Sequence, residues 1–179
     1  MRADTQVRPY TIILLEKEAV MAKILIALDS SEGAWRAVEY VAKTFGRTPG
    51  VQVTLLHILS GLPPAFWDVG HVLQDKEREA RQRLVAGWQQ DQEKKCQDLV
   101  GKAHQHLTKA GLAKEAVANK FKPKSFDVAD DIIDVAQAGG YDTVVMGRRG
   151  LGTAKALLLG SVTRKVVDSA KGCAVTIVG

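Results

Sequence analysis

The segment of this sequence best suited to chemistry is a glycine-rich stretch near its C-terminal end, residues 146–162. Gly147, Gly150 and Gly160 stand between an apolar run and a run with helical spacing. A phosphate group is bound by backbone N–H groups that converge on it, and glycine allows close approach and permits positive φ. Ser161 follows at the expected helix start, where its hydroxyl and free N–H groups can bind an anion. The segment therefore predicts a phosphate-binding loop.

Two common nucleotide-binding loops do not fit this spacing. A dinucleotide fingerprint needs G-x-G-x-x-G, whereas Gly147-x-x-Gly150-x-Gly152 has another order. A P-loop needs a lysine after its second glycine, and Thr153 follows Gly152 instead. On spacing alone, an ordinary glycine-rich turn remains as good an interpretation as a phosphate site.

Other chemistries find little support in the sequence. No set of Cys, His or carboxylate residues has metal-ligand spacing, and neither G-x-S-x-G nor H-E-x-x-H occurs. His57, at the end of an expected strand, is a candidate base or a structural residue beside the site, and we favour the second. We therefore predict no catalytic residue and no metal ligand. Whether the chain is an enzyme stays open.

The elements that must position the glycine loop alternate between strand and helix. Apolar runs predict five strands, and amphipathic or polar runs predict the helices that connect them. Gly87 and Gly101 leave two helices possible in the longest tract. The pattern predicts an α/β fold, a single doubly wound parallel sheet with helices on both faces. The expected strands are 23–28, 51–58, 116–121, 143–146 and 173–178, and the expected helices lie in 32–45, 72–110, 125–138 and 161–170.

Size, composition and charge narrow the class of protein. The chain has 179 residues, 46% hydrophobic and 25% charged, which suits one globular domain. No apolar run approaches the roughly 20 residues that span a bilayer, so we expect no membrane partner. Two cysteines favour a reducing, cytoplasmic location. The net charge of +5 comes from interleaved acids and bases, so nucleic acid is not an expected partner.

The order of these segments resembles a known family. Gly147, two residues, Gly150, nine residues and Gly160-Ser161 resemble the ATP-binding signature of universal stress proteins. The stretches 23–29, 53–58, 130–147 and 172–178 match further segments of that family in order. The resemblance covers residues 21–179, and residues 1–20 stand outside it as an N-terminal extension.

The family resemblance implies a strand order and a place for the ligand. The expected sheet is five-stranded and parallel, in the order 3-2-1-4-5. Because chain order reverses between strands one and four, a ligand should bind beyond their carboxyl ends. Asp29 and Gly147 follow those two strands. The glycine loop and the expected topology therefore indicate the same crevice.

The resemblance also implies which residues contact the nucleoside. Ala27 and Asp29 would line the base and ribose region, and Ile58 would contact the adenine through its backbone or side chain. Met146 and Gly147 would lie beneath the ribose and phosphates. Ala27 stands where many ATP-binding relatives have proline, which loosens the loop without removing a polar group.

The phosphate chain of ATP would meet the glycine loop and the helix after it. By the resemblance, Mg²⁺ or Mn²⁺ would accompany ATP, held mainly through the phosphates. Arg148 and Arg149 add positive charge near that chain, or are solvated loop cations. The residues implied to hold the phosphates are Gly150, Gly160, Ser161 and Val162.

These observations predict an ATP-binding protein that acts as a nucleotide-dependent regulator in a stress response. An alternative is a dimeric interaction module of the same family whose nucleotide site is unused, and a weaker one is a slow ATPase or phosphotransferase. We expect a homodimer through residues 173–178, an apolar run rich in β-branched residues without proline or lysine. Residues 10–15 could cover a sheet edge instead, or the tract 72–110 could form the contact.

Overall fold

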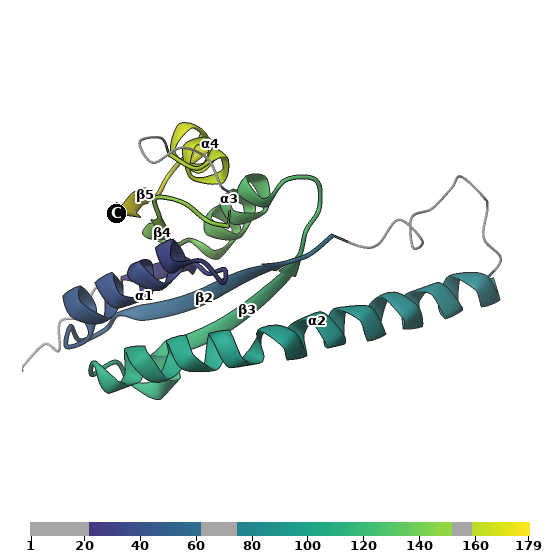
Figure 1. Cartoon of the computed structure of the whole chain (residues 1–179), viewed down its shortest axis with the longest axis horizontal. Coiled ribbons are helices and arrows are strands. Elements are labelled where there is room, and N and C mark those ends of the chain that lie inside the picture. Colours follow the sequence, from purple (N-terminus) through teal and green to yellow (C-terminus); the bar gives the residue numbers. More distant parts are fainter. Residues whose placement is uncertain (1–21, 62–74, 152–158) are drawn as a thin grey trace, which may run out of the picture.

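A computed structural model of the chain describes residues 22–61, 75–151 and 159–179 (Figure 1). Its five strands form one parallel sheet in the order β3-β2-β1-β4-β5. This confirms the predicted fold class and strand order, and every strand begins and ends within two residues of expectation. The strands are β1 (Lys23–Ala27), β2 (Gln52–Leu59), β3 (Val117–Pro123), β4 (Thr143–Gly147) and β5 (Ala174–Val178).

Helices cover both faces of the sheet, as the alternating pattern predicts (Figure 1). Two of them, α1 and α2, pack on one face, and α3 and α4 pack on the other. A short 3-10 turn, η2, leads into β3. The helices are α1 (Glu32–Phe45), α2 (Asp75–Lys109), α3 (Val128–Gly139) and α4 (Ser161–Ser169), and η2 is Lys114–Ala116.

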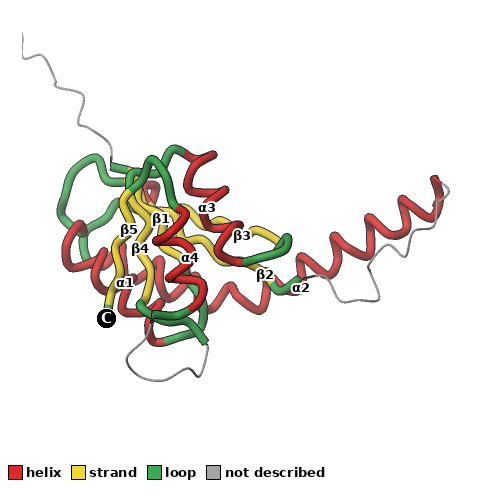
Figure 2. The backbone as a smooth tube through the Cα atoms, turned by 90° about the horizontal axis from the view of Figure 1, so that it is seen from above, coloured by secondary structure: helices red, strands yellow, loops and turns green. Residues whose placement is uncertain are grey.

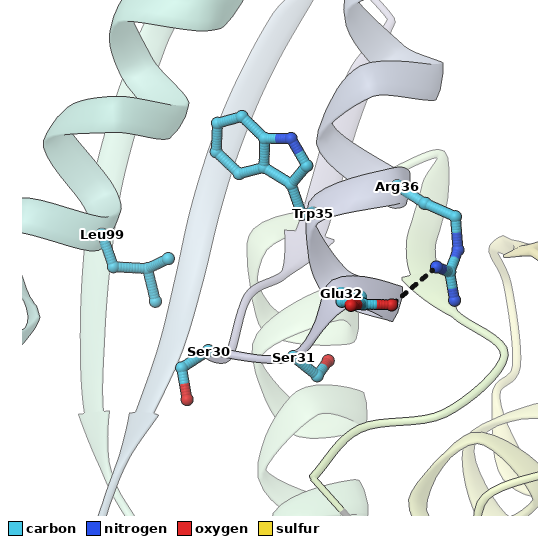
Figure 3. Close-up of a pocket in the computed structure, with 6 residues that line it drawn as sticks. All are labelled: Ser30, Ser31, Glu32, Trp35, Arg36 and Leu99. Atoms are coloured by element: carbon cyan, nitrogen blue, oxygen red, sulfur yellow. Dashed lines mark ion pairs between the residues drawn. The ribbon is translucent and has the colours of Figure 1, made fainter.

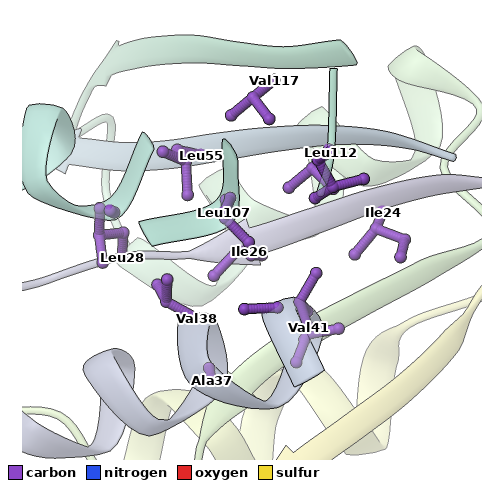
Figure 4. Packing of buried hydrophobic residues seen from close by; sticks show 14 of the residues in the cluster. Ile24, Ile26, Leu28, Ala37, Val38, Val41, Leu55, Leu107, Leu112 and Val117 are labelled. Atoms are coloured by element: carbon purple, nitrogen blue, oxygen red, sulfur yellow. The ribbon is translucent and has the colours of Figure 1, made fainter. Parts of the chain in front are cut away.

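The sheet separates two apolar clusters because successive side chains of a strand point to opposite faces. In β1, Ile24 and Ile26 belong to the cluster under α1 and α2, whereas Leu25 belongs to the cluster under α3 and α4. All three are at most 1% exposed. Figure 4 shows the first cluster, in which Val38 and Val41 of α1 meet the sheet. Burial on both faces explains why the strand runs are uninterruptedly apolar.

α2 is one helix of 35 residues, so the alternative of two helices is wrong. A Cβ at Gly87 or Gly101 would meet nothing within 4 Å, which places both glycines on open surface where they cost little packing. The last turns bury Ala103 and Leu107 against the sheet, while Leu84 in the first half is 59% exposed. In both views that first half extends beyond the sheet (Figure 2). Its sequence is accordingly polar, as a solvated helix requires.

The starts of α1 and α4 agree with the sequence-based expectation, whereas the start of α3 differs from it. The N-cap of α1 is Ser31, whose side chain accepts from the Ala34 N–H. The N-cap of α3 is Asp127, so this helix begins at Val128 and the expected start at residue 125 is wrong. The Ser125 N–H instead donates to Asp131, 2.9 Å away. The N-terminal extension, the tract 62–74 and residues 152–158 lie outside the described residues.

Candidate functional site

The predicted crevice lies where β1 and β4 run side by side in the middle of the sheet. Ile26 of β1 is paired with Val145 of β4, so both strands reach the same carboxyl edge. From this edge β1 leads into α1, which packs on one face, whereas β4 leads toward α4, which packs on the other. Two parallel strands whose connections leave in opposite directions form a topological switch point, where open α/β sheets bind ligands.

The Asp29 carboxylate organises the loop between β1 and α1. Its Oδ1 accepts hydrogen bonds from both the N–H and the hydroxyl of Ser31, the N–H bond being 2.9 Å long. The Ser31 hydroxyl in turn accepts from the Ala34 N–H at 3.2 Å. Asp29 therefore acts on α1 indirectly, by fixing the residue that caps it. Its second oxygen, Oδ2, faces Gly150 across the crevice.

Gly147 and Gly150 are glycines because other parts of the protein lie against them. A Cβ on Gly147 would lie 2.3 Å from the backbone carbon of Gly33, in the first turn of α1. A Cβ on Gly150 would lie 2.6 Å from Asp29 Oδ2. Neither has positive φ, and Gly160 has a φ of −60°, so the expectation of left-handed backbone in this loop is wrong. Close approach, and not φ, explains the first two glycines.

Gly160 differs from the other two signature glycines. The atom nearest to an added Cβ would be Arg149 Cα at 3.4 Å, which is ordinary van der Waals contact. The Gly160 N–H donates to the Arg148 carbonyl at 3.0 Å, and this bond brings the start of α4 back to the end of β4. No contact among the described residues requires glycine at this position.

Two residues that the sequence did not single out hold the site together. Thr163 is 2% exposed, and its hydroxyl donates to the Gly147 carbonyl at 3.1 Å. Gly33 lets α1 reach both Gly147 and the Arg149 carbonyl. The signal for Gly33 was a glycine in the first turn of a predicted helix, where it costs helix stability unless packing needs it. The signal for Thr163 was a polar residue on the buried face of α4.

Among the described residues, the N-terminus of α4 has no side-chain cap, whereas those of α1 and α3 are capped. Ser31 caps α1, with Glu32 in its first turn, and Asp127 caps α3, with Asp130 and Asp131 in its first turn. In α4 the N-cap is Gly160, there is no side-chain cap bond, and the first turn has no acidic residue. The exposed Ser161 begins this helix. The first N–H groups of such a helix can donate hydrogen bonds to an anion, and the positive end of the helix dipole favours negative charge there.

The apolar residues of the predicted site share one cluster. Met146 is buried in the cluster under α3 and α4, at 5% exposure. Ala27, Ile58 and Val162 are partly buried and pack against the same cluster. The structure thus gathers residues from β1, β2, β4 and α4 on one face. Arg148 and Arg149 are half-buried in the loop after β4.

Ion pairs hold α3 against its neighbours. Lys165 of α4 reaches Asp130 at 2.7 Å and Asp127 at 3.6 Å. The pKa of Asp127 is lowered, first by the Ala129 N–H and further by Lys165. Burial alone raises the pKa of Asp131, but hydrogen bonds from Lys122 and Ser125 outweigh it, so that pKa lies below its ordinary value. These charges fix the first turn of α3 beside the first turns of α4.

A separate hollow of ≈ 430 Å³ opens between α1 and α2 (Figure 3). Glu32 and Arg36 form an ion pair of 3.6 Å at its mouth, and the Trp35 ring lies toward α2. None of the predicted nucleotide-contacting residues lines it, although Ser31, which does, is hydrogen-bonded to Asp29. Its lining residues are Ser30, Ser31, Glu32, Trp35, Arg36 and Leu99.

Two features are absent from the described residues. No group of three or more His, Cys, Asp or Glu side chains is placed to hold a metal ion. Among the same residues, every helix is too short or too polar to cross a bilayer.

Comparison with known proteins adds sequence relatives. A universal stress protein of Methanocaldococcus jannaschii is 29% identical over 151 residues, covering 81% of this chain and 87% of that protein. One of Mycolicibacterium smegmatis is 26% identical over 159 residues, covering 87% of this chain. The matched region is 48% of the M. smegmatis protein, so this chain spans about half of that relative.

Solved structures share the fold. The structure of the M. jannaschii protein aligns with a TM-score of 0.65 at 21% identity, covering 89% of this chain and 97% of that one. A universal stress protein from Archaeoglobus fulgidus in complex with dAMP aligns at 0.55 and 20% identity, covering 89% and 98%. A universal stress protein in complex with cAMP aligns at 0.56 and 18% identity, covering 88% and 97%.

A family model agrees with these matches along most of the sequence. The model described as the universal stress protein family matches residues 21–179. That range contains all five strands and all four α-helices of the structure. It also contains the crevice between Asp29 and the glycine loop. The chain therefore belongs to the universal stress protein family.

Proposed function

We propose that this protein binds ATP in the crevice between the β1–α1 loop and the glycine loop, and that it acts as a nucleotide-dependent regulator in a cytosolic stress response. The observation that carries the proposal concerns the N-terminus of α4. Gly160 supplies no side-chain cap, and the first turn of α4 has no acidic residue. An anion of the size of phosphate is the ligand such a helix end attracts.

The residues around this helix end fit the rest of a nucleotide. The Ser161 hydroxyl and the first N–H groups of α4 would hold the phosphates, with Gly150, Val162 and Arg148 beside them. Asp29 Oδ2, which lies toward Gly150, would accept from a ribose hydroxyl. Ala27, Ile58 and Met146 contribute to one apolar cluster at the same edge and would line the adenine side.

Two structural relatives support a nucleotide as the ligand. One is a universal stress protein described in complex with cAMP, and another is described in complex with dAMP. Both ligands are adenine nucleotides with a phosphate group. The likeness in fold makes the same class of ligand reasonable for this chain, and ATP is our more specific proposal.

A divalent cation would accompany ATP through the phosphates. In the described part of the chain no cluster of carboxylates, histidines and cysteines is arranged to hold one. Mg²⁺ commonly binds through phosphate oxygens and water with few protein ligands, so this arrangement fits Mg²⁺ or Mn²⁺ carried by the nucleotide. When bound, the ion would neutralise phosphate charge beside the glycine loop.

A second candidate function is a dimeric interaction module, favoured by the edge strand β5. β5 is the last strand of the sheet order, and Ile177 within it is 36% exposed. Residues 173–178 could pair with the same segment of a second copy, which would extend the sheet across a two-fold axis. A homodimer of this kind is compatible with ATP binding, so we propose both, with the nucleotide sites outside the interface.

Calorimetric titration separates ATP binding from an unused site. We expect ATP with Mg²⁺ to bind with submillimolar Kd, and a saturating concentration to stabilise the fold by about 2.7 kcal/mol at 100 times Kd. Adenosine should bind more weakly, because it lacks the phosphates that α4 would hold. Absence of both heat and thermal stabilisation with ATP would refute the proposal and leave the interaction module.

A further inference from the structure

His57 of β2 has a defined tautomer. Its Nδ1 lies 2.8 Å from the Leu28 carbonyl oxygen, just after β1. A carbonyl oxygen only accepts, so Nδ1 must carry the proton and donate it. In the neutral imidazole, Nε2 is then a free base with a lone pair. The ring is also held from the side by Phe121 of β3, at a centroid distance of 6.3 Å.

Cys96 of α2 faces that basic nitrogen. Its Sγ lies 3.1 Å from His57 Nε2, and the S–H is the donor because Nε2 has none in this tautomer. Both side chains are half-buried. The three groups form a chain from Cys96 through His57 to Leu28. A nucleophile within reach of a base that a third group orients is the arrangement of activated cysteines.

The surroundings of Cys96 do not by themselves turn its thiol into a nucleophile. Burial raises the pKa of Cys96, and the neighbouring Lys95 offsets this only in part. The sulfur is therefore a protonated thiol at neutral pH, and a thiol is a poor nucleophile. His57 supplies the missing base, since its Nε2 can take the thiol proton as the sulfur attacks.

We propose that Cys96 is a site of oxidation by small hydroperoxides, with His57 as its general base and acid. The sulfur attacks one peroxide oxygen, so an S–O bond forms and the O–O bond breaks. The thiol proton passes to His57 Nε2 and then to the departing oxygen. With hydrogen peroxide the products are a sulfenic acid and water; the sulfur is oxidised by two electrons and the peroxide is reduced. A small oxidant suits a half-buried sulfur.

Oxidation would also disturb the nucleotide loop. Oxidation removes the S–H that Cys96 Sγ now donates to His57 Nε2 over 3.1 Å, so the contact that holds the His57 ring changes. His57 holds the carbonyl of Leu28, the residue before Asp29. This consequence rests on the proposed function, because it is measured as a severalfold weaker ATP affinity of the oxidised protein. An unchanged affinity would remove the coupling and leave the oxidation site in place.

The oxidation itself is tested by the rate at which each thiol reacts. Cys173 is an internal reference, because it is also a free, half-buried thiol and packs against the second apolar cluster. The intact protein is treated with hydrogen peroxide and dimedone, and labelled peptides are measured by mass spectrometry. We expect Cys96 to react at least about tenfold faster than Cys173, a modest share of the 10²–10⁴ that general-base catalysis supplies.

Two variants and one unfolding experiment make the test decisive. His57→Gln keeps an amide donor for Leu28 but removes the base, so the Cys96 rate should fall to that of Cys173. His104→Gln is the matched control, because His104 also lies on α2. This substitution should leave the rate of Cys96 oxidation unchanged. In concentrated guanidinium chloride the two wild-type thiols should react alike, which needs no variant to fold. Equal native rates, or a full rate in His57→Gln, would overturn the proposal.

Discussion

Gly147→Ala should destabilise the fold, whereas Gly160→Ala should leave the stability almost unchanged and weaken ATP binding. At Gly147 the new Cβ would lie 2.3 Å from the carbon and 2.5 Å from the oxygen of Gly33. Both are backbone atoms and cannot rotate away, so α1 and β4 must separate by about 1 Å in a close-packed interior. Such overpacking costs about 1–3 kcal/mol. For a chain of this size the Tm should fall by about 2–12 °C.

At Gly160 the same methyl group should leave the fold almost unchanged. Its nearest neighbour would be Arg149 Cα at 3.4 Å, and the backbone, with φ −60° and ψ 152°, suits alanine. Alanine is a poorer N-cap than glycine but lowers the entropy of the unfolded chain, and these effects offset each other within about 1 kcal/mol. ATP affinity should nevertheless fall by about tenfold or more, or 1.4 kcal/mol, because the methyl group occupies ligand space.

Urea unfolding and calorimetry on the same preparations distinguish the two glycines. Unfolding gives the free-energy change of each variant, and titration with ATP and Mg²⁺ gives its affinity. A Gly147→Ala protein as stable as wild type would show that α1 does not press on β4. A Gly160→Ala protein destabilised by more than about 2 kcal/mol would show that packing, and not a ligand, requires this glycine.

Three further predictions concern the supports of the site. Thr163→Val removes the buried bond to the Gly147 carbonyl and should cost about 1–3 kcal/mol in urea unfolding, whereas Thr163→Ser should cost less, and equal losses would exclude the hydroxyl as the cause. The folded pKa of Asp131 is depressed, so its contribution to stability is present above its unfolded pKa of about 3.9 and lost as pH falls through the folded pKa. Acid unfolding followed by circular dichroism should therefore be steeper below pH about 4 in wild type than in Asp131→Asn, and identical curves would contradict this. The double variant Val175→Pro, Ile177→Lys should be monomeric by light scattering if β5 is the dimer interface, and a folded dimer would point to another surface.

The strands and the parallel sheet were predictable because each element carries its own signal, whereas the strand order was implied by the family resemblance. Five apolar runs alternate with amphipathic stretches, and burial on both faces of one parallel sheet is what such runs require. The ends of β1 and β4 then locate the crevice without any side-chain geometry. The cap of α3 was not predictable, because Ser125 and Asp127 are both good N-caps two residues apart. The choice between them depends on Asp131, which binds the Ser125 N–H only in the folded protein.

The parts of the site that the sequence missed depend on contacts between distant residues. Gly33 matters because Gly147, 114 positions later, lies against it. Glycine was expected at Gly147 and Gly150 because it allows close approach of a phosphate and permits positive φ. In the structure neither residue has positive φ, and it is other parts of the protein that approach them closely. The continuity of α2 was undecided for a similar reason. Gly87 and Gly101 weaken a helix by up to about 1 kcal/mol each, and the packing of its last turns outweighs that cost.

Gly160→Asp tests most directly whether the N-terminus of α4 binds the phosphates of ATP, as we propose. An aspartate at this position can cap α4 as Asp127 caps α3. It should stabilise the fold by about 0.5–1 kcal/mol in urea unfolding, because it satisfies the free N–H groups and complements the helix dipole. In calorimetry the same variant should show no binding of ATP with Mg²⁺, where wild type binds with submillimolar Kd. A stably folded Gly160→Asp protein that binds ATP as tightly as wild type would contradict the account.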